Sequence, residues 1–273
     1  MTDATEHGLS HLTPAASRLG AAFARPKVLA VICVIVLAGL GWLALGLMVS
    51  GASAYDALCK PLIGGAWSRT SFAIVASMWS VMTLAMMLPS AAPMILTYAE
   101  IADTAARKGE PIVSPFILAA GYMLVWLGFA AAATLAQFTL THAALLDAGM
   151  GPASGWFSGV LFIAAGAYQF STLKHACLTQ CQRPFPFFFT HWASTPRGVF
   201  RLGLMQGLYC VGCCWAMMLL MFALGVMNVL WMVALGAVMT MEKIGTGRRF
   251  THTLGVMLIS AGAVFVLWPL RPI

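Results

Sequence analysis

One apolar segment of the chain carries five sulfur side chains at helical spacing. At 3.6 residues per turn these side chains fall on a single stripe of a helix. The stripe consists of Cys210, Cys213, Cys214, Met217 and Met221. Thiolates and thioethers are soft ligands that select Cu(I) and related ions. A stripe of them through a bilayer offers such an ion a series of binding positions.

Two further cysteines precede that segment and share a helix face. Cys177 and Cys181 are four residues apart, and His175 comes just before them. Two thiolates and a ring nitrogen could hold Cu(I) or zinc, with copper as the first choice. The alternative is that free cysteine serves as a small apolar core residue. The spacing of this pair does not decide between the two.

A methionine stripe occupies an earlier apolar segment. Met78, Met82 and Met86 follow one another at steps of four residues. By depth in the bilayer, the first two are predicted to lie in its outer half, level with Met217 and Met221. Together they would form an outer thioether site above the inner cysteines. Packing is the alternative, because methionine is a flexible filler of apolar cores.

Prolines interrupt the inner half of the same segment. Pro89 and Pro93 each remove a backbone donor, which predicts a kink or break near residues 88–92. On a regular helix Met87 and Met94 point away from the methionine stripe. Only a kink at Pro89 would therefore bring Met94 toward the site.

The elements that position these residues are predicted to be membrane-spanning helices. Hydrophobic residues make up 61% of the 273 residues and charged residues only 8%, which is typical of a polytopic membrane protein. The predicted fold is therefore an all-α transmembrane helix bundle with about seven spans. Windows of about twenty residues place the spans at 28–50, 72–100, 114–138, 156–174, 202–224, 225–241 and 251–268.

The distribution of Lys and Arg predicts the orientation of the bundle. With the N-terminus in the cytoplasm and the C-terminus outside, every Lys and Arg except Lys60, Arg69 and Arg271 lies on the inner side. This assignment counts Lys174 and Lys243 as inner cations and expects Glu242 to face water or headgroups. The net charge of +7 then reflects topology and the anionic bilayer surface, and it requires no nucleic acid.

The domain organisation follows from the same pattern. Residues 1–27 lack the apolar core of a signal peptide and are predicted to be a disordered cytoplasmic tail. Residues 28–270 are predicted to be one transmembrane domain with an inner amphipathic, interfacial loop at 175–201. The turn at 225–228 could be a hairpin between two spans or part of a re-entrant pair, which would move the C-terminus to the other side. A bacterial cytoplasmic (inner) membrane is the expected location.

The sequence lacks the residues that several function classes require. No histidine lies clearly in the middle of a predicted span, which argues against haem, and the last span lacks the lysine that retinal would need. Proton-coupled carriers usually need an Asp or Glu in the middle of a span, and no predicted span has one. No Ser/His/Asp set or phosphate loop appears, so we predict no catalytic residues and favour a protein that is not an enzyme.

Three segments of the chain resemble a known family. They are 79–94, which carries the methionines and prolines, 168–181, which ends in Cys-Leu-Thr-Gln-Cys, and 212–228, which begins with Gly-Cys-Cys-Trp. The family consists of bacterial integral membrane proteins of unknown function that are described as predicted metal-binding. The resemblance implies that metal binding is shared. Thr172 departs from the pattern, where we expect the family to prefer proline.

The leading hypothesis is a membrane protein that handles Cu(I), either in uptake or in delivery to a partner enzyme. The methionines would receive the ion from outside, the cysteines of the 202–224 segment would hold it, and Cys177 and Cys181 would pass it to a cytosolic or membrane acceptor. One alternative is a thiol-redox membrane enzyme. Another is a structural subunit or assembly factor of a membrane complex. A homo-oligomer is allowed by all three.

Overall fold

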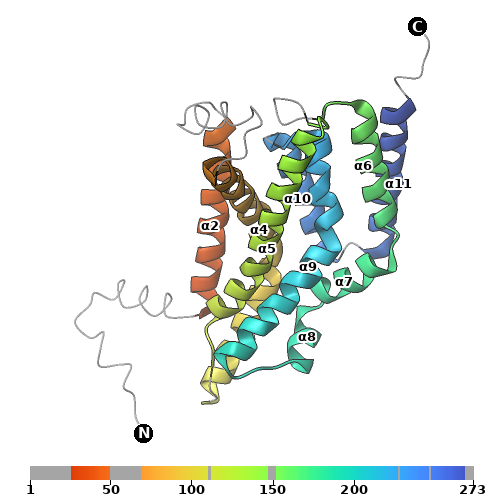
Figure 1. Cartoon of the computed structure of the whole chain (residues 1–273). Coiled ribbons are helices and arrows are strands. Elements are labelled where there is room, and N and C mark those ends of the chain that lie inside the picture. Colours follow the sequence, from red (N-terminus) through yellow and green to blue (C-terminus); the bar gives the residue numbers. More distant parts are fainter. Residues whose placement is uncertain are drawn as a thin grey trace.

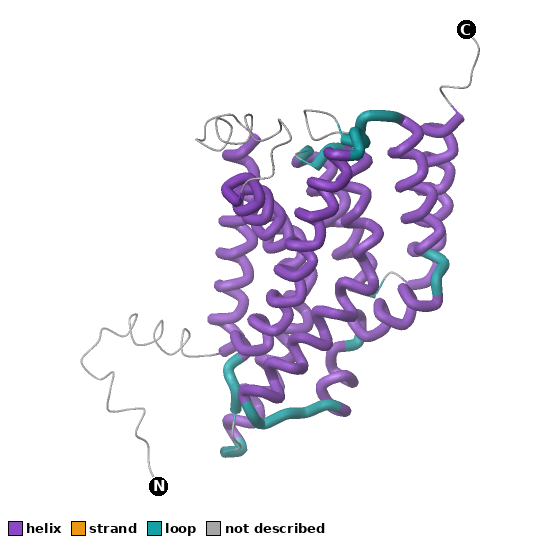
Figure 2. The backbone as a smooth tube through the Cα atoms, viewed as in Figure 1, coloured by secondary structure: helices purple, strands orange, loops and turns teal. Residues whose placement is uncertain are grey.

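The computed structural model describes residues 26–49, 69–109, 112–146, 152–226, 228–245 and 247–267. These residues form nine helices (Figures 1 and 2). The helices are α2 (Pro26–Val49), α4 (Arg69–Arg107), α5 (Pro115–His142), α6 (Gly155–Tyr168), α7 (Thr172–Gln182), α8 (Pro184–Thr190), α9 (Pro196–Leu224), α10 (Val229–Ile244) and α11 (Gly247–Leu267). The predicted tail at 1–27 lies outside the described residues, except for its last two, which begin α2.

Polar side chains set the starts of most of these helices. A side-chain oxygen accepts a hydrogen bond from a backbone N–H of the first turn, which satisfies one of the donors that a helix start leaves unpaired. The capping residues are Ser114 of α5, Ser154 of α6, Ser171 of α7, Thr195 of α9 and Asn228 of α10. In α5 and α9 a proline follows the cap, where its missing N–H costs nothing.

Four helices are long and apolar enough to cross a membrane, namely α4, α5, α9 and α11. The all-α, multi-pass character predicted from composition is therefore confirmed. Residues 31–47 of α2 and the 14-residue α6 are apolar but shorter. The predicted span at 156–174 is wrong in its inner part, because the helix ends at Tyr168 and Ser171 caps a separate helix.

Helix α9 lies at the centre of the bundle and contacts α5, α6, α7 and α10. Helix α4 packs against α2, α5 and α10, and its C-terminal part contacts α8. Helices α6 and α11 lie side by side at one edge of the bundle (Figure 1). The short helices α7 and α8 connect α6 to the start of α9, so α7 brings its side chains directly to the central helix.

Glycines allow the backbones of two helix pairs to approach closely. A Cβ atom at Gly203 of α9 would collide with the Leu118 carbonyl of α5, and one at Gly121 would collide with the Phe200 carbonyl. In the α6–α11 pair, a Cβ atom at Gly262 would lie 2.7 Å from the Gly159 carbonyl oxygen. Such close approach stabilises helix pairs in membranes, where no hydrophobic force drives them together.

The second predicted span, where a kink or break was expected, forms a helix without a break. Helix α4 runs without interruption for 39 residues and contains both Pro89 and Pro93. Neighbouring helices cover α4 on several sides, which holds the helix together across positions that lack an N–H donor. The predicted break near residues 88–92 was therefore wrong, whereas the alternative of a kink at Pro89 stays a prediction.

The connection between α9 and α10 is a tight turn. Helix α9 ends at Leu224, and Gly225 adopts a positive φ of 93° that only glycine enters readily. The side chain of Asn228 then accepts a hydrogen bond from the Trp231 backbone and starts α10. Because α9 and α10 also contact each other, the turn joins two adjacent helices, as the hairpin interpretation required.

Candidate metal centre

Three thiols of α9 form a compact buried cluster. The sulfur atoms of Cys210, Cys213 and Cys214 all lie within 4.8 Å of one another, and each residue is at most 2% exposed. The thiols of Cys213 and Cys214 donate to the Cys210 carbonyl, so both point back along the helix toward the first cysteine. We call these three residues the thiol cluster. Its donor set suits Cu(I).

Helix α7 adds a fourth sulfur. The Cys181 sulfur lies 3.9 Å from the Cys213 sulfur, across the contact between α7 and α9. Cys177 packs on Gly212, where a Cβ atom would lie 2.6 Å from its sulfur. Both cysteines of α7 therefore face α9, as their four-residue spacing predicted.

His175 does not join these two cysteines. Its Nε2 atom lies 3.3 Å from Nε2 of His252 on α11. Among the described residues, the thiol cluster is the group of three or more His, Cys, Asp or Glu side chains close enough to share an ion, and neither Cys177 nor His175 belongs to it. The ligand set that joined His175 to both cysteines of α7 is therefore not formed.

Helix α4 contributes a thioether that the sequence analysis excluded. The Cys214 thiol lies 4.0 Å from the sulfur of Met87, which is fully buried. Met87 was expected to point away from the site because it leaves the stripe of Met78, Met82 and Met86. That expectation was wrong, since α4 is covered on several sides and its buried residues extend beyond one stripe.

Two side-chain contacts define how α4 and α9 face each other. Trp79 packs against Phe222 with ring centroids 5.3 Å apart, and Met87 meets Cys214 eight residues further along α4 and eight residues back along α9. This antiparallel register brings Met82 level with Leu219, between Met217 and Met221 of α9. Met78, Met82, Met86, Met217 and Met221 are all buried in the same core.

Met86 lies beside a different helix from Met87. It faces Gly236 of α10, where an added Cβ atom would lie 3.7 Å from its Cγ atom. The four remaining predicted methionines continue toward the end of the bundle where α9 ends, and Met217 follows Cys214 by three residues on α9. The predicted sulfur ladder therefore contains a compact thiol cluster and continues in buried methionines.

A buried lysine and two hydroxyl groups surround the thiol cluster. The Lys243 ammonium donates to the Cys210 sulfur at 2.9 Å and to the Ser90 hydroxyl at 2.7 Å. The Tyr122 hydroxyl lies 2.9 Å from the same sulfur. Sequence analysis did not include these groups in the site. Their positions depend on how α4, α5 and α10 pack around α9.

A buried ion pair lies next to this network. Lys174 of α7 donates to the Glu242 carboxylate of α10 at 2.8 Å, and their side chains are 0% and 2% exposed. Gln182 of α7 also donates to the Glu242 backbone carbonyl. The expectations that Lys174 and Lys243 are inner-side loop cations and that Glu242 faces water or headgroups were wrong. A pairing partner on a distant segment makes their burial tolerable.

The thiols of α7 are held in the protonated form by their surroundings. Burial raises the pKa of the Cys177 thiol, and the nearby sulfur of Cys213 adds to this effect. Hydrogen bonds to Cys210 and Cys213, together with burial, raise the pKa of the Cys181 thiol well above its usual range. Burial lowers the pKa of His175, and the charge of Arg248 lowers it further. A metal ion that binds these thiols must therefore displace their protons.

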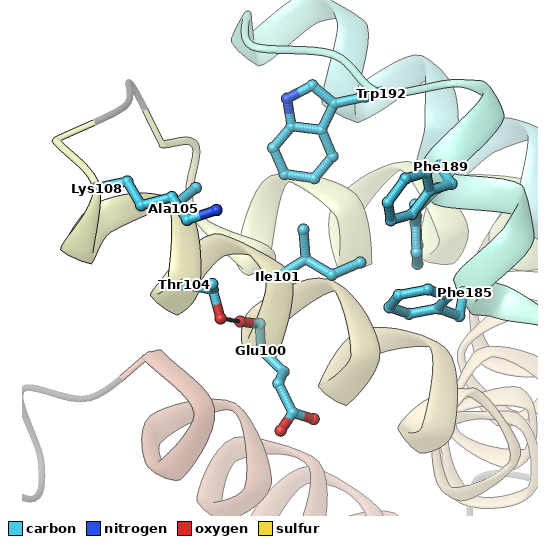
Figure 3. Close-up of a pocket in the computed structure, with 9 residues that line it drawn as sticks. Glu100, Ile101, Thr104, Ala105, Lys108, Phe185, Phe189 and Trp192 are labelled. Atoms are coloured by element: carbon cyan, nitrogen blue, oxygen red, sulfur yellow. Dashed lines mark hydrogen bonds between the residues drawn. The ribbon is translucent and has the colours of Figure 1, made fainter.

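A separate cavity of about 430 Å³ lies between the C-terminal end of α4 and α8 (Figure 3). Phe185, Phe189 and Trp192 form one wall, and Ile101 of α4 and Lys108, just beyond the end of α4, lie opposite. Phe185 and Phe189 are exposed, and the interfacial character of residues 175–201 stays a prediction. The lining is mostly aromatic and aliphatic, with Glu100, Thr104 and Lys108 as its polar members, and none of these residues carries sulfur.

The fold and site together define a multi-pass membrane helix bundle with a buried centre of thiol and thioether ligands. A family model described as "PpoB2: Copper chaperone" matches residues 76–265, which is more than half of the chain. The chain therefore belongs to this family of copper chaperones. The resemblance to predicted metal-binding membrane proteins is thereby narrowed to a copper chaperone family. Searches of curated proteins and of solved structures found no significant match.

Proposed function

We propose that the chain is a copper chaperone of the bacterial inner membrane that holds Cu(I) on the thiol cluster and delivers it to an acceptor. The observation that carries this proposal is the meeting of the thiol cluster with Cys181 and Met87 in a buried volume. Soft sulfur ligands prefer Cu(I) to harder ions. Membership of the copper chaperone family supports the same ion and a delivery role.

The proposed path of the ion follows the arrangement of sulfur atoms. Met78, Met82, Met217 and Met221 receive copper in the outer half of the bundle, with Met86 beside α10, because thioethers bind without losing a proton. The thiol cluster binds more tightly, since thiolates are stronger ligands. Cys181, which already touches the cluster, and then Cys177 pass the ion to the acceptor.

The proposed topology places seven spans in the membrane: α2, α4, α5, α6, α9, α10 and α11. Exposed arginines gather at the end of the bundle where α4 ends and α9 and α11 begin, namely Arg107, Arg183, Arg197, Arg201, Arg248 and Arg249. We call this the basic end. The positive-inside rule places it in the cytoplasm, with the N-terminus inside and the C-terminus outside.

The test is the copper content of detergent-purified protein after expression with copper and zinc available. We expect about one tightly bound copper per chain, retained through purification, in the wild type and the loss of this tightly bound ion in the double variant Cys213→Ser, Cys214→Ser. Cys33→Ser is the matched control, because Cys33 is a cysteine of α2 outside the thiol cluster. Equal copper content in the wild type and the double variant would remove the central claim.

One observation favours a second candidate function. The 3.9 Å separation of Cys181 and Cys213 is short enough that a small movement would allow a disulfide between α7 and α9. A thiol-redox enzyme would oxidise these two thiols, releasing two protons and passing two electrons to a quinone. Turnover of a quinone with a dithiol by metal-free protein, lost in Cys181→Ser, would favour this function over copper delivery.

A further inference from the structure

Two histidines from distant parts of the chain meet between α7 and α11. Their Nε2 atoms are 3.3 Å apart, and their rings are inclined by 70°. The ring of Phe170 packs against His252 with centroids 5.2 Å apart and holds that imidazole in place. Both histidines are half-buried, so the pair is neither fully solvated nor sealed in the core.

The distance between the two nitrogens matches a shared metal ion. Imidazole binds zinc at about 2.0–2.1 Å, and two such bonds at a tetrahedral angle place the nitrogens roughly 3.3 Å apart. Imidazole is also a good ligand for copper. Without an ion, one Nε2–H donates to the other Nε2 atom. When an ion binds, that proton moves to Nδ1, so both rings act as neutral ligands and no net charge is lost.

A polar cavity of about 370 Å³ adjoins this pair and gives room for further ligands. His175 lines it, together with Thr179 and Gln182 of α7 and Arg248 and Thr251 of α11. Two ligands leave two positions of a tetrahedral ion open for water or for a donor from another molecule. The positive charge of Arg248 favours an anionic donor such as the thiolate of an acceptor.

Helix α7 connects the two clusters. Cys181 and Cys177 face α9, whereas His175, near the start of the same helix, faces α11. The buried pair between Lys174 and Glu242 fixes this part of α7 against α10. An ion that leaves Cys181 for the solvent side therefore has a second set of ligands on the same helix, at the basic end.

We propose that His175 and His252 form a second metal site, separate from the thiol cluster, which holds Cu(I) before an acceptor takes it. The identity of the ion rests on the proposed copper function, but the existence of the site rests on the pair itself. The site is weaker than the thiol cluster, because it has two neutral ligands in place of several thiolates. It is therefore suited to release.

The experiment is a titration of Cu(I), with a colorimetric chelator as competitor, into the variant Cys213→Ser, Cys214→Ser under anaerobic conditions. We expect one weakly bound copper ion per chain with nitrogen ligands in its X-ray absorption spectrum. Adding His175→Gln and His252→Gln, singly or together, should abolish it, because an amide keeps a hydrogen bond but is a poor copper ligand. His191→Gln is the matched control. His191 follows the last residue of α8, and its described contacts include no other histidine.

The outcomes separate this proposal from the proposed function. Copper binding that persists in both glutamine variants, or that is absent from the starting cysteine variant, would overturn the histidine site. Wild-type protein without sulfur-bound copper would overturn the thiol cluster as a copper centre, while nitrogen-bound copper lost with the histidines would still establish the second site. Circular dichroism and size-exclusion chromatography of each variant show that a loss of copper is not a loss of fold.

Discussion

The ammonium of Lys243 lies 2.9 Å from the sulfur of Cys210, inside a core where both residues are almost fully buried. A Cu(I) ion held by two thiolates carries a single negative charge, and burying an unpaired charge is costly. Lys243 supplies the opposite charge at the ligand itself. The neighbouring pair of Lys174 and Glu242 is already neutral and cannot take this role.

Replacing Lys243 by Met should weaken Cu(I) binding about 10- to 100-fold, the range seen when groups that support metal ligands are removed. The physical reason is the loss of the counter-charge beside Cys210. Competition with a Cu(I) chelator measures the change. Lys243→Arg keeps the charge and should retain more of the affinity than Lys243→Met. Identical affinities for the wild type and the Met variant would show that the ammonium does not act on the bound ion.

Replacing Met87 by Leu should remove one sulfur from the copper environment. The two side chains have similar volumes, so stability should change by less than about 1.5 kcal/mol. X-ray absorption of the copper-loaded protein counts the sulfur neighbours. Met94→Leu is the control, because Met94 is also a buried methionine of α4 but has no recorded contact with the thiol cluster. An unchanged sulfur count in Met87→Leu would mean that this thioether is packing only.

Replacing Glu242 by Gln should destabilise the protein by about 3–5 kcal/mol, because Lys174 would keep a buried charge without its partner. Thermal unfolding in detergent measures the effect. The matched control is Asp103→Asn, which removes an ion pair with Arg107 on α4 whose side chains are 75% and 29% exposed. Such exposed pairs contribute about 0–1 kcal/mol. Equal losses in the two variants would contradict the role assigned to the buried pair.

Replacing Gly203 by Ala should force α5 and α9 apart, since the new Cβ atom would collide with the Leu118 carbonyl. Overpacking of this kind costs about 1–3 kcal/mol. Gly128→Ala provides the comparison, because nothing lies within 4 Å of a Cβ atom at that position of α5, the helix that Gly203 packs against. That control should leave stability unchanged or raise it slightly, because alanine favours helix. A Gly203 variant as stable as the wild type would refute close packing at this crossing.

The sequence analysis correctly predicted the features that depend on residues close together along the chain. Apolar periodicity placed the helices at 202–224 and 114–138, and helical spacing placed Cys210, Cys213 and Cys214 together. The same reasoning set Cys177 and Cys181 on one face. Helix ends were less accurate, because capping residues such as Ser171 and Thr195 decide them and not the apolar pattern.

The remaining parts of the site depend on contacts between distant segments. Lys243 and Glu242 stand at the end of an apolar stretch, where charges usually face headgroups, and only the approach of α7 and α9 makes them buried. Met87 could not be selected from periodicity, because several helices surround α4. No sequence pattern indicated that His252 would meet His175, because their contact depends on the packing of α11 against α7.

Five helices contribute to the surroundings of the thiol cluster, through Met87 of α4, Tyr122 of α5, Cys181 of α7, the cluster itself on α9 and Lys243 of α10. During synthesis, Lys243 is the last of these residues to leave the ribosome. A nascent chain that has inserted only as far as α9 therefore carries every cysteine of the centre but lacks its balancing charge. If the thiol cluster holds Cu(I) as proposed, unfinished chains should bind the ion more weakly than the finished protein.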